Sequence, residues 1–173
     1  QKAVGYSLTG RIDEHCLFFL YGTGKNGKTT ITETLRQLFG DYSRGVPIEA
    51  LMQTIGGRGG AATPYIASMV GARLVLASEL SENRHLNESL IKDLTGGDSI
   101  TARHLYNDPF TFAPSHKLWI YGNYKPKVSG TDEGFWRRIH LIPFKVTIPE
   151  GERRPTSEVI ANHEQENSGI LTW

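Results

Sequence analysis

The sequence predicts an α/β domain with a central, mostly parallel sheet and helices on both faces. Apolar segments of buried-strand length recur along the chain, at residues 17–21, 73–79, 117–123 and 139–144. Apolar residues at helical spacing follow the first of these segments. A length of 173 residues suits one domain with a sizeable core. We therefore expect a single domain over residues 1–173, with its core at about 15–148 and a C-terminal extension after it.

A glycine-rich loop follows the first predicted strand. It contains the pattern G-x-x-x-x-G-K-T, and apolar residues at helical spacing come after it until Gly40. A strand before and a helix after distinguish a phosphate-binding loop from an ordinary connector. Glycines let backbone N–H groups approach phosphate oxygens, and the helix N-terminus adds partial positive charge. We expect Lys28 to reach the β- and γ-phosphates and the Thr29 hydroxyl to bind Mg²⁺. The predicted nucleotide-binding residues are Gly22, Thr23, Gly24, Lys25, Asn26, Gly27, Lys28, Thr29 and Thr30.

Turn and cap residues predict the next elements in order. Residues 1–16 form a lead-in helix or loop, and residues 45–48 form a short strand near a sheet edge, since proline limits pairing. Thr63 and Pro64 are typical of the N-cap and first residue of a helix, which Gly71 ends.

Two more segments belong to this middle region. A second glycine cluster at residues 56–60 has no strand before it, so a mobile surface loop is favoured over a loop that closes on a ligand. Asn87 is typical of the N-cap of a further helix. Leu86, just before the cap, is able to pack against Ile91 of that helix as a hydrophobic staple. Residues 96–98 end this helix.

Polar residues follow two of the predicted strands. Ligands of parallel sheets lie at the carboxyl ends of the strands. Glu79 is expected to polarise the attacking water or to hold Mg²⁺ through water, and the alternative is a residue that pairs with a surface arginine. Asn123 is expected beside Glu79 if the two strands are neighbours, where its amide would orient water; the alternative is a turn-forming asparagine.

Residues 99–105 and 110–112 predict a β-hairpin around the turn-forming residues 106–109. Arg103, His104 and Tyr106 bring cationic and aromatic groups near its tip. Such a mixture suits single-stranded nucleic acid, whose phosphates need charge and whose bases need a stacking face. From these residues alone, an ordinary surface hairpin remains the alternative.

Two adjacent arginines, Arg137 and Arg138, precede the last predicted strand. Successive residues of a strand point to opposite faces, so only one of the two is able to point into a given face. One is a candidate arginine finger, and the other is a candidate partner for an acid. Arg153 and Arg154 lie in a polar region and are interpreted as solvated surface.

Composition limits the class of protein. The single cysteine, Cys16, excludes an internal disulfide and a cysteine-rich zinc site, and it is expected in the core beside the first strand. It fits a reducing, cytoplasmic compartment. No apolar run reaches membrane-spanning length, so no membrane partner is expected. The formal net charge of +1 means that any contact with DNA must come from a local basic patch. The first residue is not Met, which suggests a fragment of a longer protein.

The order of these motifs resembles the superfamily 3 helicases of the AAA+ class. It looks most like the C-terminal helicase domain of phage and plasmid primases, which is related to the poxvirus NTPase-primase. The resemblance covers nearly the whole chain and rests on residues 5–10, 20–30, 72–80, 91–98, 118–123, 136–144 and 169–173.

The resemblance implies a role for each motif. Gly22 to Thr30 would bind ATP, Glu79 would be the Walker B acid that helps to hold Mg²⁺, and Asn123 would sense the γ-phosphate. Residues 92–98 would match an extra motif peculiar to this superfamily, in which Lys92 would contact DNA rather than lie on a simply solvated helix face. The DNA-contacting hairpin with Arg103 and His104 would follow this motif. Arg137 or Arg138 would reach the ATP of a neighbouring subunit. Many members carry two acids at the end of the Walker B strand, whereas this sequence has Ser78 at the first position.

The activity implied by the resemblance is ATP-driven translocation on, and unwinding of, replicating DNA, with single-stranded or forked DNA as the partner. The implied assembly is a ring, most simply a hexamer, with a primase domain in the same polypeptide and a location in the host cytoplasm if the element is viral or plasmid-borne. Two alternatives remain open. A P-loop phosphotransferase such as a nucleotide kinase would need an acceptor site, for which the sequence shows no motif. A replication scaffold that binds ATP with little turnover is compatible with Ser78.

Overall fold

The computed structural model describes residues 1–53, 63–78, 85–125 and 132–172. Its main sheet has five parallel strands in the order β2-β3-β6-β1-β7. These strands are β1 (Leu17–Tyr21), β2 (Ser43–Pro47), β3 (Leu74–Ser78), β6 (Lys117–Gly122) and β7 (Ile139–Pro143). The predicted mostly parallel sheet is therefore confirmed, and the proline-containing β2 lies at an edge, as expected.

The register brings the carboxyl ends of the strands to one edge of the sheet. Tyr21 at the end of β1 pairs with Gly122 of β6 on one side and with Pro143 of β7 on the other. Ser78 at the end of β3 pairs with Tyr121 of β6. The strands that precede Glu79 and Asn123 are thus neighbours, which was the condition for those residues to act together. Glu79 itself lies outside the described residues.

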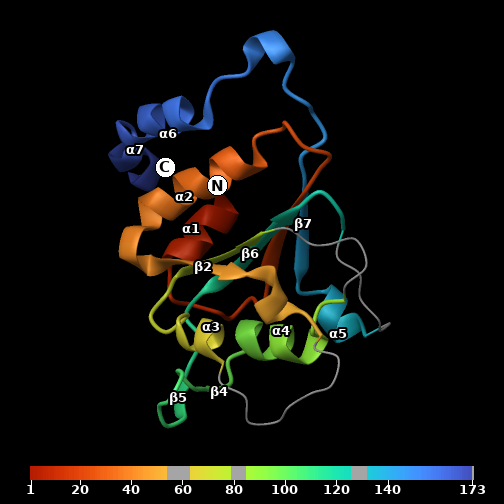
Figure 1. Ribbon diagram of the computed structural model, residues 1–173, viewed down its shortest axis with the longest axis vertical. Coiled ribbons are helices and arrows are strands. Elements are labelled where there is room, and N and C mark those ends of the chain that lie inside the picture. The colour runs from red at the N-terminus through yellow and green to blue at the C-terminus, as the bar shows by residue number, and fades with distance from the viewer. Residues whose placement is uncertain (54–62, 79–84, 126–131, 173) are drawn as a thin grey trace.

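Helices cover both faces of the sheet (Figure 1). One face carries α1 (Lys2–Leu8) and α2 (Lys28–Phe39), and the other carries α3 (Pro64–Ala67), α4 (Glu88–Thr95) and the short 3₁₀ helix η2 (Ile48–Leu51). Side chains of β1 alternate between the two layers, as the pleat of a strand requires. Phe18 and Leu20 belong to the core under α2, whereas Leu17 and Phe19 belong to the core under α4. Cys16 is buried in the α2 layer, as predicted.

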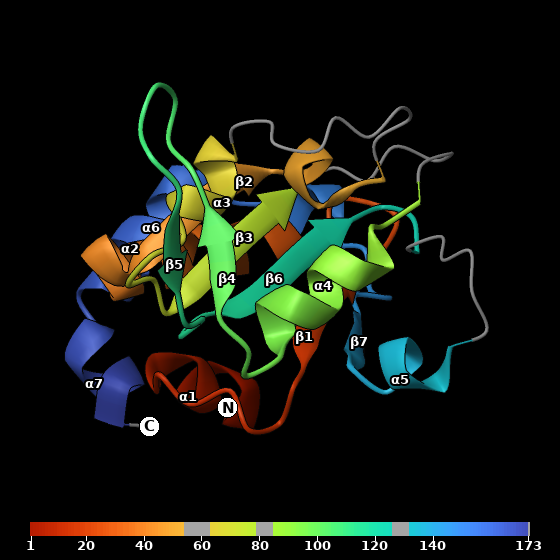
Figure 2. The ribbon, with the colours of Figure 1, turned by 90° about the horizontal axis from the view of Figure 1, so that it is seen from below.

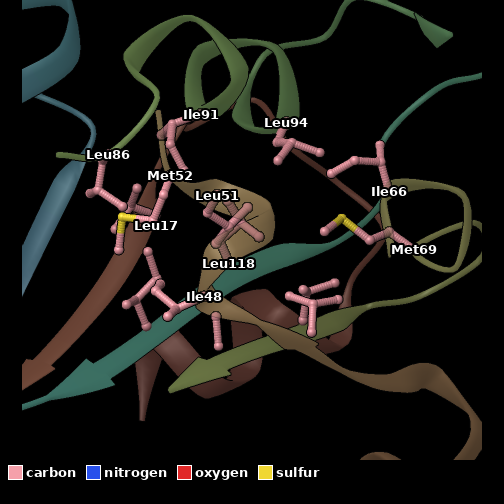
Figure 3. Packing of buried hydrophobic residues seen from close by; sticks show 14 of the residues in the cluster. Leu17, Ile48, Leu51, Met52, Ile66, Met69, Leu86, Ile91, Leu94 and Leu118 are labelled. Carbon is pink, nitrogen blue, oxygen red and sulfur yellow. The ribbon is translucent and has the colours of Figure 1, made fainter. Parts of the chain in front are cut away.

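The layer under α4 forms a continuous apolar core. Figure 3 shows Ile91 and Leu94 of α4 pointing toward Leu51 of η2 and Leu118 of β6. Asn87 caps this helix, because its side chain accepts a hydrogen bond from the Leu90 N–H at 3.1 Å. The predicted N-cap is confirmed.

The hairpin consists of β4 (Ile100–Ala102) and β5 (Phe110–Phe112), which pair antiparallel in a separate two-stranded sheet before β6. Figure 2 shows it extending away from the main sheet. The predicted first strand, 99–105, was too long. Arg103 leaves the ladder because its N–H donates to the Thr63 hydroxyl at 3.1 Å and its C=O accepts from the Thr63 N–H at 3.0 Å.

The same contact corrects the prediction for α3. Thr63 is the N-cap residue, but its side chain makes no capping hydrogen bond because its hydroxyl binds Arg103. The helix ends at Ala67, and a turn leads from there to Gly71, whose φ is +73°. The prediction that the helix continues to Gly71 was wrong. The glycine cluster 56–60 lies outside the described residues.

Three helices complete the chain. The one-turn α5 (Glu133–Trp136) precedes β7, and α6 (Thr156–Glu164) and α7 (Asn167–Thr172) follow it. In Figure 1, α6 and α7 lie beside α2 on the side away from the sheet. Among the described residues, no helix combines the length and the apolar character that crossing a membrane would require.

Candidate functional site

The loop between β1 and α2 adopts the tight path that its glycines predict. Gly24 and Gly27 have φ values of +102° and +84°, which glycine adopts without strain. A side chain at Gly22 would place its Cβ 2.2 Å from the Phe144 carbonyl oxygen, so the backbone itself fills that space. The loop leads directly into α2 at Lys28, where the first N–H groups of a helix have no intrahelical acceptor. The end of the loop is therefore electropositive and rich in hydrogen-bond donors.

Lys28 spans this loop from the inside. Its Nζ donates to the Gly22 carbonyl oxygen at 2.7 Å and to Asn26 Oδ1 at 3.0 Å. The Asn26 amide nitrogen donates in turn to the Phe144 carbonyl oxygen at 3.0 Å, which ties the loop to the segment after β7. Lys28 is 5% exposed, and burial lowers the pKa of its ammonium. The loop is thus held in shape around a buried positive charge.

A polar cleft of about 740 Å³ opens along this loop at the carboxyl edge of the sheet. The structure brings Thr29, Ser78 and Asn123 to its walls, three positions that lie far apart in the sequence. Its lining residues include the loop positions from Gly24 to Thr30, together with Glu49 and Thr156. Glu49 was not among the residues predicted from the sequence. Its position two residues after Pro47, the proline of the predicted edge strand, could have indicated that it lies at the same carboxyl edge as the other polar residues.

The donor set of the cleft fits a magnesium nucleotide. Hydroxyl and carboxylate oxygens of Thr29, Ser78 and Glu49 are the hard ligands that Mg²⁺ accepts, either directly or through water. Lys28 and the start of α2 supply the charge for phosphates. Within the described ranges there is no cluster of three or more His, Cys, Asp or Glu side chains that would hold a metal by itself. Phosphate oxygens would therefore have to complete the ligand shell of a metal here.

A second, mostly apolar cavity of about 1110 Å³ continues from the phosphate loop, between α2 and the C-terminal helices. Ile31 and Leu35 of α2 face Val159 of α6 across it. Its wall shares Lys25, Gly27, Thr30 and Thr156 with the polar cleft. The Thr34 hydroxyl donates to the Thr30 carbonyl oxygen, and its oxygen lies 3.1 Å from His163 Nδ1, where it accepts a hydrogen bond if that nitrogen carries the proton. This contact anchors α6 over α2.

The predicted DNA-contacting residues of the hairpin, Arg103, His104 and Tyr106, are spread from the base of its loop to the tip. Tyr106 is fully exposed and has a φ of +62°, and Leu105 beside it is also exposed. The His104 ring stacks on Phe110, with 5.5 Å between ring centroids. Arg103 is held at the base of the loop by Thr63. The predicted turn at residues 106–109 therefore belongs to a loop whose base is held by Thr63 and whose tip is apolar and aromatic.

Lys92 and the two arginines lie elsewhere. Lys92 on α4 forms an ion pair with Asp132, the N-cap of α5, rather than pointing freely into solvent. Arg138 Nη1 donates to the Gly134 carbonyl oxygen at 2.5 Å, and in the part of the chain that the structure describes its buried Nε has no hydrogen-bond partner. Arg137 is exposed. The Arg138 carbonyl accepts from the Leu17 N–H, so both arginines lie at the amino end of the sheet, opposite the phosphate loop.

The parallel sheet and the strand–loop–helix at its centre define an α/β domain of the P-loop type. Comparison with known proteins narrows the class further. A model of a family of unknown function, DUF5906, matches residues 20–138, which is more than half of the chain, and the chain belongs to that family.

Viral proteins are among its relatives. The chain is 34% identical over 137 residues to "Putative helicase L207/L206" of Acanthamoeba polyphaga mimivirus, covering 79% of this chain and 14% of that protein. It is 27% identical over 150 residues to Primase D5 of fowlpox virus, covering 82% of this chain and 18% of that protein. The chain therefore spans less than a fifth of the length of either relative. The predicted similarity to the poxvirus primase group is confirmed at this level.

A solved structure shares the fold. The NrS-1 C-terminal region, in its apo A form, superposes with a TM-score of 0.70 at 14% identity, over 98% of this chain and 40% of that one. At this identity the likeness concerns the fold alone, and it includes the arrangement of the parallel sheet and its covering helices.

Proposed function

We propose that this chain is the ATP-hydrolysing domain of a replication helicase or translocase that moves on single-stranded DNA. The observation that carries the proposal is the polar cleft at the carboxyl edge of the sheet. The residues that line it include Lys28, Thr29, Ser78 and Asn123. The names of the viral relatives support the same class of activity.

In this proposal, ATP enters with its phosphates along the loop. Without nucleotide, the contacts of Lys28 with Gly22 and Asn26 hold the loop in the conformation that binds phosphates. When ATP binds, the Lys28 ammonium exchanges these contacts for phosphate oxygens. Thr29 binds Mg²⁺, which neutralises phosphate charge. Asn123 orients the attacking water, and Glu79 activates it. The apolar cavity beside α2 accepts the base and ribose.

The position of the arginines favours a ring. Arg138 lies at the amino end of β1, and the phosphate loop begins at its carboxyl end. Five strand residues separate the two, which is roughly 15 Å, farther than an arginine side chain reaches. Arg137 or Arg138 would then act on the ATP of a neighbouring subunit. In other NTPases such a finger contributes about 10³–10⁵ in rate.

The test is ATP hydrolysis at high protein concentration, with and without single-stranded DNA, comparing the wild type with Lys28→Ala, Arg137→Ala and Arg138→Ala. The proposal predicts turnover that rises with DNA and that is lost in Lys28→Ala and in at least one of the two arginine variants. A wild type that hydrolyses ATP equally well with and without DNA, and that keeps its activity in Arg137→Ala and Arg138→Ala, would contradict it. Transfer of the γ-phosphate to nucleosides or their monophosphates would instead support a phosphotransferase.

A further inference from the structure

Glu49 is a carboxylate in a cleft that is otherwise built for anions. It lies on η2, between Ile48 and Leu51, which are buried at 2% and 0% exposure. These two anchors hold the helix against the core under α4, and the Met52 N–H donates to the Glu49 carbonyl oxygen at 3.3 Å. Glu49 itself is exposed, and it lines the cleft.

The sheet register explains how Glu49 reaches the phosphate loop. β2 pairs with β3 so that Pro47 is opposite Ser78, the last residue of β3. Glu49 comes two residues later, past the same carboxyl edge. Thr29 at the start of α2 completes the group, since all three residues line one cleft. Two hydroxyls and one carboxylate therefore share the space next to the expected phosphates.

The charge of Glu49 needs a counterpart. Among the described residues it forms no ion pair. A carboxylate next to a polyphosphate is repelled unless a cation lies between them. Mg²⁺ keeps several of its waters when it binds a nucleotide, and carboxylates hold those waters by accepting their hydrogen bonds. Ser78 supplies only a hydroxyl, so Glu49 is the one carboxylate among the described residues that line this cleft.

We propose that Glu49 is a positioning residue for the hydrated Mg²⁺ of the bound nucleotide, acting beside the Thr29 and Ser78 hydroxyls that line the same cleft. This inference rests on the proposed function, because it requires a nucleotide in the cleft. Glu49 increases the affinity for Mg²⁺ in the ternary complex and contributes little to the affinity for the metal-free nucleotide, which it repels.

The experiment measures equilibrium binding of a fluorescent ATP analogue to the whole chain, first in excess EDTA and then in a Mg²⁺ titration. The variants are Glu49→Gln, which removes the charge and keeps the shape, and the control Asp41→Asn, which removes one charge from the exposed turn before β2, outside the cleft. Glu49→Gln is expected to raise the Mg²⁺ concentration at half-saturation about 10-fold. Its affinity in EDTA should be equal to that of the wild type or higher, and Asp41→Asn should match the wild type throughout.

Several results would overturn the inference. An unchanged Mg²⁺ midpoint in Glu49→Gln would remove the metal role. If hydrolysis nevertheless fell in that variant, Glu49 would act on water or on the fold, and thermal unfolding separates those two. A wild type that binds the analogue equally well with Mg²⁺ and in EDTA would contradict the inference and leave nucleotide binding intact. A wild type that does not bind the analogue at all would contradict the proposed function as well.

Discussion

The ammonium of Lys92 on α4 is paired with the carboxylate of Asp132, which also caps α5. Asp132 Oδ1 accepts from the Gly134 N–H at 2.7 Å, and the Gly134 carbonyl accepts from Arg138. A continuous set of contacts thus joins α4, the helix before the hairpin, to α5, the helix before the arginine pair. α4 and α5 lie near each other in Figure 1, and the Lys92–Asp132 ion pair connects them. The hydrogen bonds from Lys92 and from the Gly134 N–H hold the pKa of the Asp132 carboxyl below its usual value.

Breaking this pair should weaken communication between hairpin and arginines more than it weakens the fold. We expect Asp132→Ala to reduce DNA-stimulated ATP turnover by about 2- to 30-fold, while turnover without DNA changes less. The ion pair is partly exposed and contributes little to stability, whereas loss of the Asp132 cap on α5 costs about 1 kcal/mol, so the unfolding temperature should fall only modestly. Steady-state ATPase assays with increasing single-stranded DNA measure this. Glu133→Gln, at the next position along α5, is the control. Equal losses with and without DNA in Asp132→Ala would contradict the coupling.

The tip of the hairpin should contact bases. Tyr106→Asn is expected to weaken single-stranded DNA binding by about 1–3 kcal/mol, the effect of losing one aromatic stacking partner. Asparagine tolerates the positive φ of this position, so the loop keeps its shape. Because Tyr106 is fully exposed, thermal stability should not change. The measurement is fluorescence anisotropy with labelled oligonucleotides, and Tyr42→Asn on the opposite layer is the control. Equal affinities of Tyr106→Asn and the wild type would remove the hairpin tip from the DNA path.

A buried histidine should make the domain sensitive to acid. His116 precedes β6 and is 2% exposed, and within the described residues neither of its ring nitrogens has a hydrogen-bond partner. Burial, with a smaller effect from the Lys117 charge, lowers the pKa of His116 to about 4. The unfolded chain takes up this proton near pH 6.5, whereas the folded chain resists it until about pH 4. The free energy of unfolding should therefore fall by about 3 kcal/mol between those two values.

Urea unfolding of the wild type and of His116→Leu at pH 7 and pH 4.5 tests this. The variant should lose less stability on acidification than the wild type, since it has no group to protonate at that site. His140→Gln, at an exposed position of β7, should show the acid sensitivity of the wild type. A parallel loss of stability in all three proteins would assign the acid effect to other groups.

Local patterns predicted those parts of the molecule that depend on local forces. The strand 17–21, the start of α2 after the glycine loop, the cap at Asn87 and the edge position of β2 all follow from periodicity, turn chemistry and the missing N–H of proline. The predictions failed where a distant residue decides the outcome. Arg103 leaves its strand to bond with Thr63, 40 residues earlier, and the same contact removes the expected side-chain cap of α3.

The candidate site also combines residues that a local pattern predicts with residues that only the three-dimensional fold brings together. The loop residues around Lys28 are recognisable because their spacing encodes the chemistry. Glu49 and the pairing of Lys92 with Asp132 depend on the sheet order and on how α5 packs beside α4, neither of which a pattern in a single segment contains. The roles of Glu79, Asn123 and the two arginines stay predictions.

If two subunits share each ATP site, two inactive variants with defects in different halves of that site should restore activity when they are mixed. Lys28→Ala keeps the arginines but has no working phosphate loop, and Arg137→Ala with Arg138→Ala in one chain keeps the loop but has no finger. Each should hydrolyse ATP at a small fraction of the wild-type rate, because a finger supplies about 10³–10⁵ in rate. Mixed at high concentration with single-stranded DNA, they should regain turnover as the loop of one chain meets the arginines of the other. A mixture no more active than its two components, in a preparation where light scattering shows mixed assemblies, would contradict the shared site.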